Sequence, residues 1–270
     1  MIQTNLPPLF FSSIPKCGKN LIYSFFFALG YKRFQFEDES YNNYSNLLPF
    51  HDLHDRDHYV TERSSVLGMD YERTVRDFKA AVCAIPNGYI GHRHMHPDDE
   101  LLNALRIARI KPIFIYRDPR DCLVSAVHFA FKGKPAHVSG MLGGLSEEDA
   151  LLALLDGHDT LIPFAQWFDA YRPWLDVPDA ITLRFEDIIG ARGGGTDAKQ
   201  KECFENLISG LGIQVTRPVF EAALSLAFNP RAGTFRSGQI GGWRESFSKK
   251  VALEFEQKAG HLLNLWNVKT

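Results

Sequence analysis

The 270-residue sequence has few cysteines, no excess of positive charge and no long apolar run. Its four cysteines lie far apart, so we expect neither a zinc site with paired spacing nor the disulfide framework of a small secreted protein. The net charge of −2 excludes an overall basic field that would hold nucleic acid or an anionic membrane. No stretch approaches the ~20 apolar residues of a membrane span, and the first residues lack the basic start of a signal peptide. We therefore expect a cytoplasmic protein with reduced thiols and no nucleic-acid or membrane partner.

The sequence contains 45% hydrophobic residues, enough to bury a sizeable core, and we expect a single domain over residues 1–270. Apolar runs typical of buried parallel strands alternate with helical patterns. This alternation predicts an α/β fold with a central parallel β-sheet flanked by helices, where ligands bind at the carboxyl ends of the strands. The expected strands are residues 9–11, 89–92, 110–116 and 180–185, and the expected helices include residues 21–29, 97–107 and 119–131.

The most informative segment, residues 12–20, joins the first expected strand to the first expected helix. It contains one glycine, Gly18, and two lysines, Lys16 and Lys19. Backbone N–H groups at a helix N-terminus and lysine side chains both attract anions. The segment therefore predicts a phosphate-binding loop, and a merely structural turn is the simpler alternative.

A second anion motif begins where the expected strand at residues 110–116 ends. Arg117 follows this strand, and Ser125 lies two turns into the next expected helix. A guanidinium and a hydroxyl can together hold a phosphate through charge-assisted hydrogen bonds. The alternative is that Arg117 pairs with Asp118 or Asp121 in a solvated loop.

Four motifs together resemble those of the sulfotransferases that use 3′-phosphoadenosine 5′-phosphosulfate (PAPS). Residues 15–20, Pro-Lys-Cys-Gly-Lys-Asn, resemble the phosphosulfate loop of that family, and residues 117–129 resemble its 3′-phosphate motif. Residues 185–187, Phe-Glu-Asp, resemble its Tyr-Glu-Asp segment, and residues 236–244 resemble its late glycine-containing loop. The motifs follow one another in the order found in the family. The resemblance implies a PAPS-dependent sulfotransferase with a P-loop-like fold, which releases 3′-phosphoadenosine 5′-phosphate (PAP).

The resemblance also implies a role for each matching residue. A base must take a proton from the attacking group, and a cation must stabilise the leaving oxygen. His92 stands where the family has its catalytic histidine, with His94 in reserve, and Lys16 is the corresponding cation. Phe185 keeps an aromatic face near the adenine. The implied cofactor-binding residues are Lys16, Cys17, Gly18, Lys19, Asn20, Arg117, Ser125, Phe185, Arg236, Ser237 and Gly238, and no metal is expected.

Three alternating histidines, His92, His94 and His96, raise the alternative of a metal site. Their side chains would share one face of an extended chain, as metal ligands sometimes do. No carboxylate or further ligand follows at a diagnostic spacing, so the sequence favours a catalytic histidine over a metal centre.

Two other functions stay open at this point. A P-loop nucleotide-dependent phosphotransferase would need an earlier glycine in the loop, and a serine or threonine for magnesium where Asn20 stands. A non-catalytic nucleotide-binding module would keep the binding motifs without turnover. The presence of both Lys16 and His92 favours an enzyme.

The acceptor and the assembly are less constrained. The resemblance implies in-line transfer to a hydroxyl or amine of a small-molecule acceptor. Acidic residues are frequent in residues 37–72, which leaves both a cationic acceptor and a solvated acidic surface open. The apolar residues of the closing helix fit either a monomer or a homodimer.

Two local expectations concern the second half of the chain. Residues 190–197 contain three consecutive glycines and are predicted to form a flexible surface loop. Phe228 is expected to be a core phenylalanine rather than a wall of an adenine site.

Overall fold

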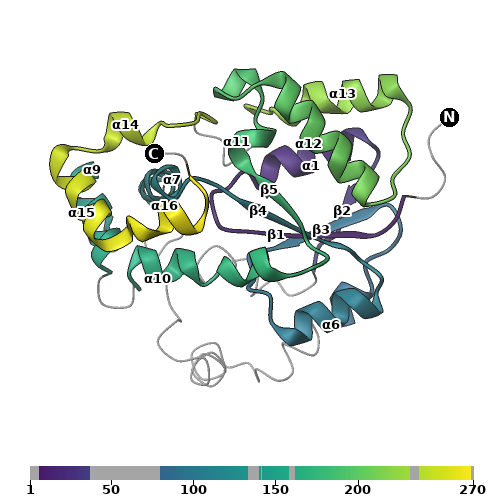
Figure 1. The fold of residues 1–270 in the computed structure, drawn as a ribbon, viewed down its shortest axis with the longest axis horizontal. Coiled ribbons are helices and arrows are strands. Elements are labelled where there is room, and N and C mark those ends of the chain that lie inside the picture. Colours follow the sequence, from purple (N-terminus) through teal and green to yellow (C-terminus); the bar gives the residue numbers. More distant parts are fainter. Residues whose placement is uncertain are drawn as a thin grey trace. The chain divides into compact units, whose positions relative to one another are not determined.

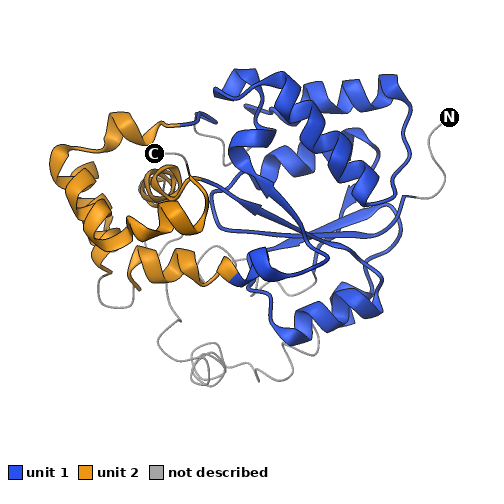
Figure 2. Cartoon of the chain, viewed as in Figure 1, with its two compact units in different colours: residues 1–37, 77–117, 173–240 blue, residues 38–76, 118–172, 241–270 orange. Residues whose placement is uncertain are grey.

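The computed structural model describes residues 6–36, 80–132, 140, 142–157, 162–231 and 237–268. The predictions for the acidic segment 37–72 and for Arg236 lie outside the described residues. The chain divides into two compact units, which Figure 2 distinguishes by colour and which are described separately below. Unit 1 comprises residues 1–37, 77–117 and 173–240, and unit 2 comprises residues 38–76, 118–172 and 241–270.

A five-stranded sheet of order β2-β3-β1-β4-β5 forms the centre of unit 1. Every pair of neighbouring strands is parallel. The inner strand β1 is buried along its whole length, as the continuous apolar run at residues 9–11 predicts. The predicted central parallel sheet is therefore confirmed. Its strands are β1 (Leu9–Ser13), β2 (Lys32–Arg33), β3 (Tyr89–Arg93), β4 (Pro112–Tyr116) and β5 (Ile181–Arg184).

Helices flank this sheet in unit 1, with α6 on one side and α1, α12 and α13 on the other (Figure 1). Phe25 of α1 holds its layer together, because its ring centroid lies 4.2 Å from that of Phe204 in α12 and 5.9 Å from that of Phe220 in α13. Full burial of such a side chain contributes about 1.5–3 kcal/mol. The helices are α1 (Lys19–Ala28), α6 (Asp99–Ile107), α11 (Phe185–Ile188), α12 (Asp197–Gly210) and α13 (Arg217–Ala227).

Unit 2 is helical in its described residues, and aromatic side chains fill its core. The ring of Phe168 lies 5.2 Å from that of Trp266, and the ring of Phe164 lies 6.5 Å from that of Phe255. All four side chains are buried, which links helices far apart in the sequence. The helices are α7 (Pro119–Phe131), α9 (Glu147–Asp156), α10 (Phe164–Asp169), α14 (Trp243–Ser246), α15 (Lys249–Ala259) and α16 (His261–Leu265).

The glycine-rich segment after α11 differs from its prediction. Residues Ala191–Gly193 form a short 3₁₀ helix, η2, and Gly193 is buried. A β-carbon at Gly193 would lie 2.6 Å from the carbonyl oxygen of Gly238, and Ile240 N donates to the carbonyl of Gly193 at 2.9 Å. The prediction of a flexible surface loop is wrong at η2, because the absence of a side chain there allows close backbone packing.

Phe228 also differs from its prediction. It is half-buried, and the guanidinium of Arg192 lies 4.7 Å from its ring centroid, so the expectation of a core phenylalanine is wrong.

Among the helices that the structure describes, none combines the length and the hydropathy needed to cross a membrane.

Candidate functional site

The predicted site residues of unit 1 follow strands whose carboxyl ends lie at one edge of the sheet. Phe11 of β1 pairs with His92 of β3, and Ser13 of β1 pairs with Ile115 of β4. Because these strands are parallel, the chain leaves all of them at the same edge. The loop after β1, the histidines of β3 and Arg117 after β4 are therefore brought together there.

The turn between β1 and α1 has an unusual backbone. Lys16 and Gly18 both have positive φ angles, 72° and 93°. A β-carbon at Gly18 would lie 2.6 Å from the Phe185 ring, so a larger residue would displace that ring. Gly18 caps α1 without a side-chain hydrogen bond, and the first turn of α1 contains no acidic residue. The positive end of the helix dipole is thus not neutralised by a carboxylate of its own first turn, which suits a phosphate ligand.

The other predicted residues of this loop lie directly beside the cap. Cys17 is buried, and its thiol lies 3.9 Å from the carbonyl oxygen of Pro15. Lys19 and Asn20 are the first two residues of α1 and are half-buried. All the loop residues named by the sequence are therefore at the N-terminus of α1.

Arg117 connects three of the predicted motifs. Its Nη2 donates to the carbonyl of Gln239 at 2.7 Å, and its Nη1 donates to the carbonyl of Lys16 at 3.4 Å. Its guanidinium carbon lies 4.1 Å from the ring centroid of Phe185. Arg117 is buried, in contrast to the arginine of a solvated loop that the sequence left open. It holds the phosphate turn, Phe185 and the late loop in one place.

The late loop reaches this site through its backbone. Ser237 and Gly238 precede Gln239, and Gly238 has a φ angle of 61°. The side-chain amide of Gln239 donates to the carbonyl of Arg192 at 2.9 Å. Ser237 and Gly238 therefore belong to the same unit as the phosphate turn.

His92 and His94 are both buried and share Ser13 as a partner. Ser13 Oγ lies 3.1 Å from His92 Nε2 and 3.2 Å from His94 Nδ1. His94 Nδ1 also lies 2.7 Å from the carbonyl oxygen of Ser13. A carbonyl only accepts, so Nδ1 of His94 carries a proton and its Nε2 holds the lone pair in the neutral ring. The two imidazoles are 4.5 Å apart at their centroids, which places both candidate bases beside the phosphate turn.

Burial and nearby cations keep both imidazoles neutral. Burial first, then the lysine Lys19, lowers the pKa of His94 to about 3, against the hydrogen bond to Ser13. The pKa of His92 is held well below its usual value by burial first and then by His94, Lys19, Arg93 and Arg33. A neutral imidazole can accept a proton, as a general base must.

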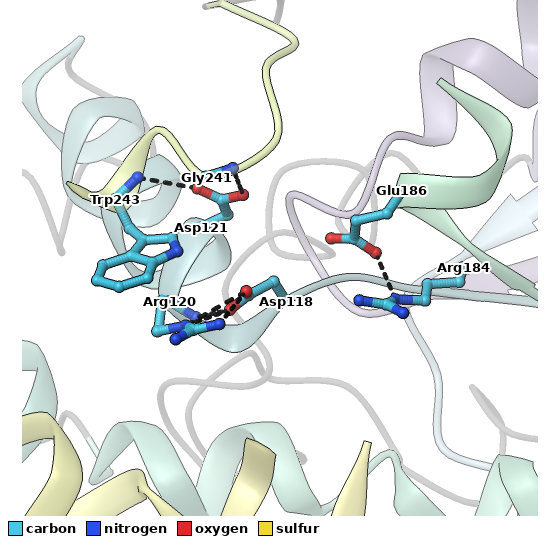
Figure 3. Close-up of polar contacts among 7 residues, drawn as sticks. All are labelled: Asp118, Arg120, Asp121, Arg184, Glu186, Gly241 and Trp243. Atoms are coloured by element: carbon cyan, nitrogen blue, oxygen red, sulfur yellow. Dashed lines mark hydrogen bonds and ion pairs between the residues drawn. The ribbon is translucent and has the colours of Figure 1, made fainter. Parts of the chain in front are cut away.

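The N-terminus of α7 lies in unit 2 and is neutralised internally (Figure 3). Asp118 caps the helix by accepting from Arg120 N and also forms an ion pair with the Arg120 guanidinium, Nη2 to Oδ2 2.7 Å. Asp121 accepts from the backbone N–H groups of Gly241 at 2.8 Å and Trp243 at 3.0 Å. Ser125 is half-buried on the same helix. Within unit 1, Glu186 pairs with Arg184 at 2.9 Å, so this carboxylate has a structural partner.

The sequence missed three residues of the site. Ser13 was one of them, although it ends the strand that leads into the phosphate turn. Arg33 and Arg93 were the others. Arg93 stands between the two histidines in the sequence, whereas only the pairing of β2 with β3 brings Arg33 close to them. Among the described residues, no group of three or more histidine, cysteine, aspartate or glutamate side chains could hold a metal ion.

The chain resembles known proteins in its sequence pattern and in its fold. The family model described as "Sulfotransferase domain" matches residues 6–189. Mouse sulfotransferase SULT7A1 complexed with PAP has a similar structure, with a TM-score of 0.58, 15% identity, and coverage of 95% of this chain and 84% of the other. Retinol dehydratase complexed with androsterone and the inactive cofactor PAP has a TM-score of 0.56, 15% identity, and coverage of 96% and 81%. No curated protein sequence matches this one.

Proposed function

The chain belongs to the sulfotransferase domain family, and we propose that it transfers a sulfonate group from PAPS to a small-molecule acceptor. The acceptor contributes a hydroxyl or an amine, and the reaction is an in-line displacement with His92 as the base. The observation that carries this proposal is the neutral, buried His92 on the strand next to the phosphate turn. The retained base and turn favour an enzyme over a binding module.

The residues of the site fit the charge and shape of PAPS. The left-handed backbone at Lys16 and Gly18 turns the chain around the N-terminus of α1, where no first-turn acid repels a phosphate. Lys16, Lys19 and Asn20 would hold the 5′-phosphosulfate, and Arg117 would hold the 3′-phosphate from above Phe185. When bound, PAPS supplies the sulfonate group and an anionic leaving oxygen.

Each protein group then has one task in the reaction. His92 takes the proton of the acceptor, and Ser13 Oγ orients the imidazole through Nε2. Lys16 stabilises the negative charge that develops on the leaving oxygen. The fixed turn and strand ends keep the attacking group close to the sulfur, which removes much of the entropic cost of the encounter.

Further predictions from the sequence are part of this proposal. Ser125, in unit 2, and Arg236 complete the 3′-phosphate contacts, and both units form one sulfotransferase domain. The protein is cytoplasmic and is a monomer or a homodimer.

Calorimetric titration with PAP, and with ATP with and without magnesium, tests the donor. We expect tight PAP binding that does not need magnesium and that is lost in Arg117→Met. Preference for magnesium-ATP would instead support a phosphotransferase.

Replacement of His92 by asparagine should lower kcat about 10²- to 10⁴-fold with little change in PAP affinity, as expected for loss of a general base. Unchanged turnover in that variant would reject the assignment of His92.

A further inference from the structure

A row of side chains on α1 faces the proposed base. Lys19, Tyr23 and Phe27 stand four residues apart and therefore share one face of the helix. The ring of Tyr23 stacks on that of Phe27 at 5.1 Å, and its centroid lies 6.1 Å from that of His92. This face of α1 thus forms one side of the surroundings of His92.

Arg33 reaches the same place from the edge of the sheet. It belongs to β2, and its guanidinium carbon lies 5.4 Å from the centroid of the Tyr23 ring. The strand order β2-β3-β1 separates Arg33 from the phosphate turn by the width of β3, the strand that carries His92 (Figure 1). A donor in the phosphate turn lies on the β1 side of His92. The acceptor must approach from another direction, and the β2 side is where Arg33 stands.

The charged groups around His92 are all cations in the part of the chain that the structure describes. Those that act on the imidazole are Lys19, Arg93 and Arg33, with His94 beside them. Lys16 acts on His94 as well. Burial, followed by Arg33 and Arg93, lowers the pKa of Lys19 to about 8. Within the described ranges, Arg33 contacts the ring of Tyr23 and forms no ion pair.

This arrangement poses a problem for base catalysis. His92 becomes a cation when it takes the proton of the acceptor, and a new cation beside lysine and arginine is unfavourable. The phosphosulfate can offset Lys16 and Lys19, but Arg33 lies on the far side of β3. A negative charge on the acceptor would offset Arg33 and favour protonation of His92 at the same time.

We propose that the acceptor carries an anionic group, such as a carboxylate, phosphate or sulfate, and that Arg33 binds this group while His92 takes the proton from the nearby hydroxyl or amine. The inference rests on the proposed function and names its substrate class. Arg33 is a specificity-determining residue in this view. We therefore expect an anionic acceptor, whereas the acidic residues of segment 37–72 had left a cationic acceptor open.

Matched acceptors that differ in charge test this proposal. The probes are para-hydroxybenzoate, para-hydroxybenzamide and tyramine, together with glycolate, glycolamide and ethanolamine, each tested with PAPS. Within each set, we expect the carboxylate to have a kcat/KM about 10- to 100-fold above that of its amide, as for a hydrogen bond to a charged group. Equal or better use of the neutral or cationic member would overturn the proposal.

Two variants of β2 locate the effect. Arg33→Gln should abolish the preference for the carboxylate over the amide and leave the PAP affinity within about twofold. Lys32→Gln is the matched control, because Lys32 is also exposed but its neighbouring position places it on the opposite face of the strand. An equal loss for all acceptors in Arg33→Gln would mean that Arg33 serves the fold or the donor, and would reject the proposal.

If the protein turns over none of these probes, the affinity of the probes for the protein tests the proposal instead. PAP-saturated protein should then bind para-hydroxybenzoate more tightly than para-hydroxybenzamide, and no binding of the carboxylate would count against the proposal. Failure of the unchanged protein to bind PAP would instead reject the proposed function, and the inference would fall with it. PAP binding without any charge preference rejects the inference alone.

Discussion

Two helices that follow strands of the sheet begin in opposite ways. Helix α1 starts at Gly18, with no side-chain cap and no acid in its first turn. Helix α7 starts at Asp118, whose side chain caps the helix, and has Asp121 in its first turn. The N-terminal charge of α7 is neutralised by carboxylates of its own first turn and cap, whereas no first-turn carboxylate neutralises that of α1. In the proposed function, α7 therefore begins in a structural way, and the start of α1 is open to the phosphosulfate.

The ion pair at α7 is the strongest test of the structural side of this comparison. Asp118→Asn keeps the capping oxygen but leaves the buried Arg120 guanidinium, which lies 4.2 Å from the Trp243 ring centroid, without its carboxylate. We expect the free energy of unfolding to fall by about 3–5 kcal/mol, the usual cost of removing one partner of a buried pair. Urea unfolding measures this loss.

The exposed pair of Lys199 and Glu202 provides the control. Lys199→Gln should leave the free energy of unfolding nearly unchanged, because solvent screens an exposed ion pair. Similar losses in both variants would show that the pair at α7 is no more important than a surface contact.

The binding side of the comparison is tested by making α1 resemble α7. Asn20→Asp adds a carboxylate to the first turn of α1 with almost no change in shape. We expect PAP to bind about 10- to 100-fold more weakly, because a negative charge now faces its phosphates, while the helix is stabilised by about 0.3–1 kcal/mol. Calorimetry and urea unfolding measure the two opposite effects.

Lys250→Glu makes the corresponding change in α15, whose first turn also lacks an acid. It should leave PAP affinity unchanged. If Asn20→Asp binds PAP as well as the unchanged protein does, the N-terminus of α1 does not hold a phosphate.

A smaller effect is expected from the second acid of α7. Asp121 accepts from the amides of Gly241 and Trp243 with different oxygens, and Asn offers one acceptor oxygen instead of two. Asp121→Asn should therefore destabilise the protein by about 1.5 kcal/mol, the cost of one unsatisfied buried donor. Hydrogen exchange should quicken at one of these two amides. Unchanged exchange at both would mean that Asp121 does not hold residues 241–243.

The sequence predicted the parallel sheet, and it named the residues that lie at the N-terminus of α1, because both segments have strong local patterns. The apolar run of β1, the glycine turn and the start of α1 are contiguous, and so are β4 and Arg117. The position of Arg33 beside Tyr23 and His92 could not be predicted, since β2 is only two residues long and its neighbour β3 lies more than fifty residues later. The prediction for Gly193 was wrong for a related reason. A run of glycines looks the same in the sequence whether it forms a flexible loop or allows close packing against a distant segment, here Gly238.

A pH-dependent effect concerns the histidines beside α1, whose pKa values are lowered by burial first and then by neighbouring cations. The folded-state pKa of His94 is about 3, below the usual value of 6.5, and that of His92 is lowered as well. The unfolded chain therefore binds more protons than the folded chain below pH 6.5, so stability is full above this pH and falls as the pH drops toward about 3.

Each histidine should contribute a slope of up to about 1.4 kcal/mol per pH unit to this acid destabilisation. Urea unfolding between pH 6.5 and about 5, above most carboxyl titrations, measures the slope in the unchanged protein, in His94→Asn and in the double variant with His92→Asn. The slope should decrease stepwise, because asparagine cannot bind the proton that the folded state excludes. An unchanged slope in the double variant would show that the folded state does not lower the pKa values of these two imidazoles.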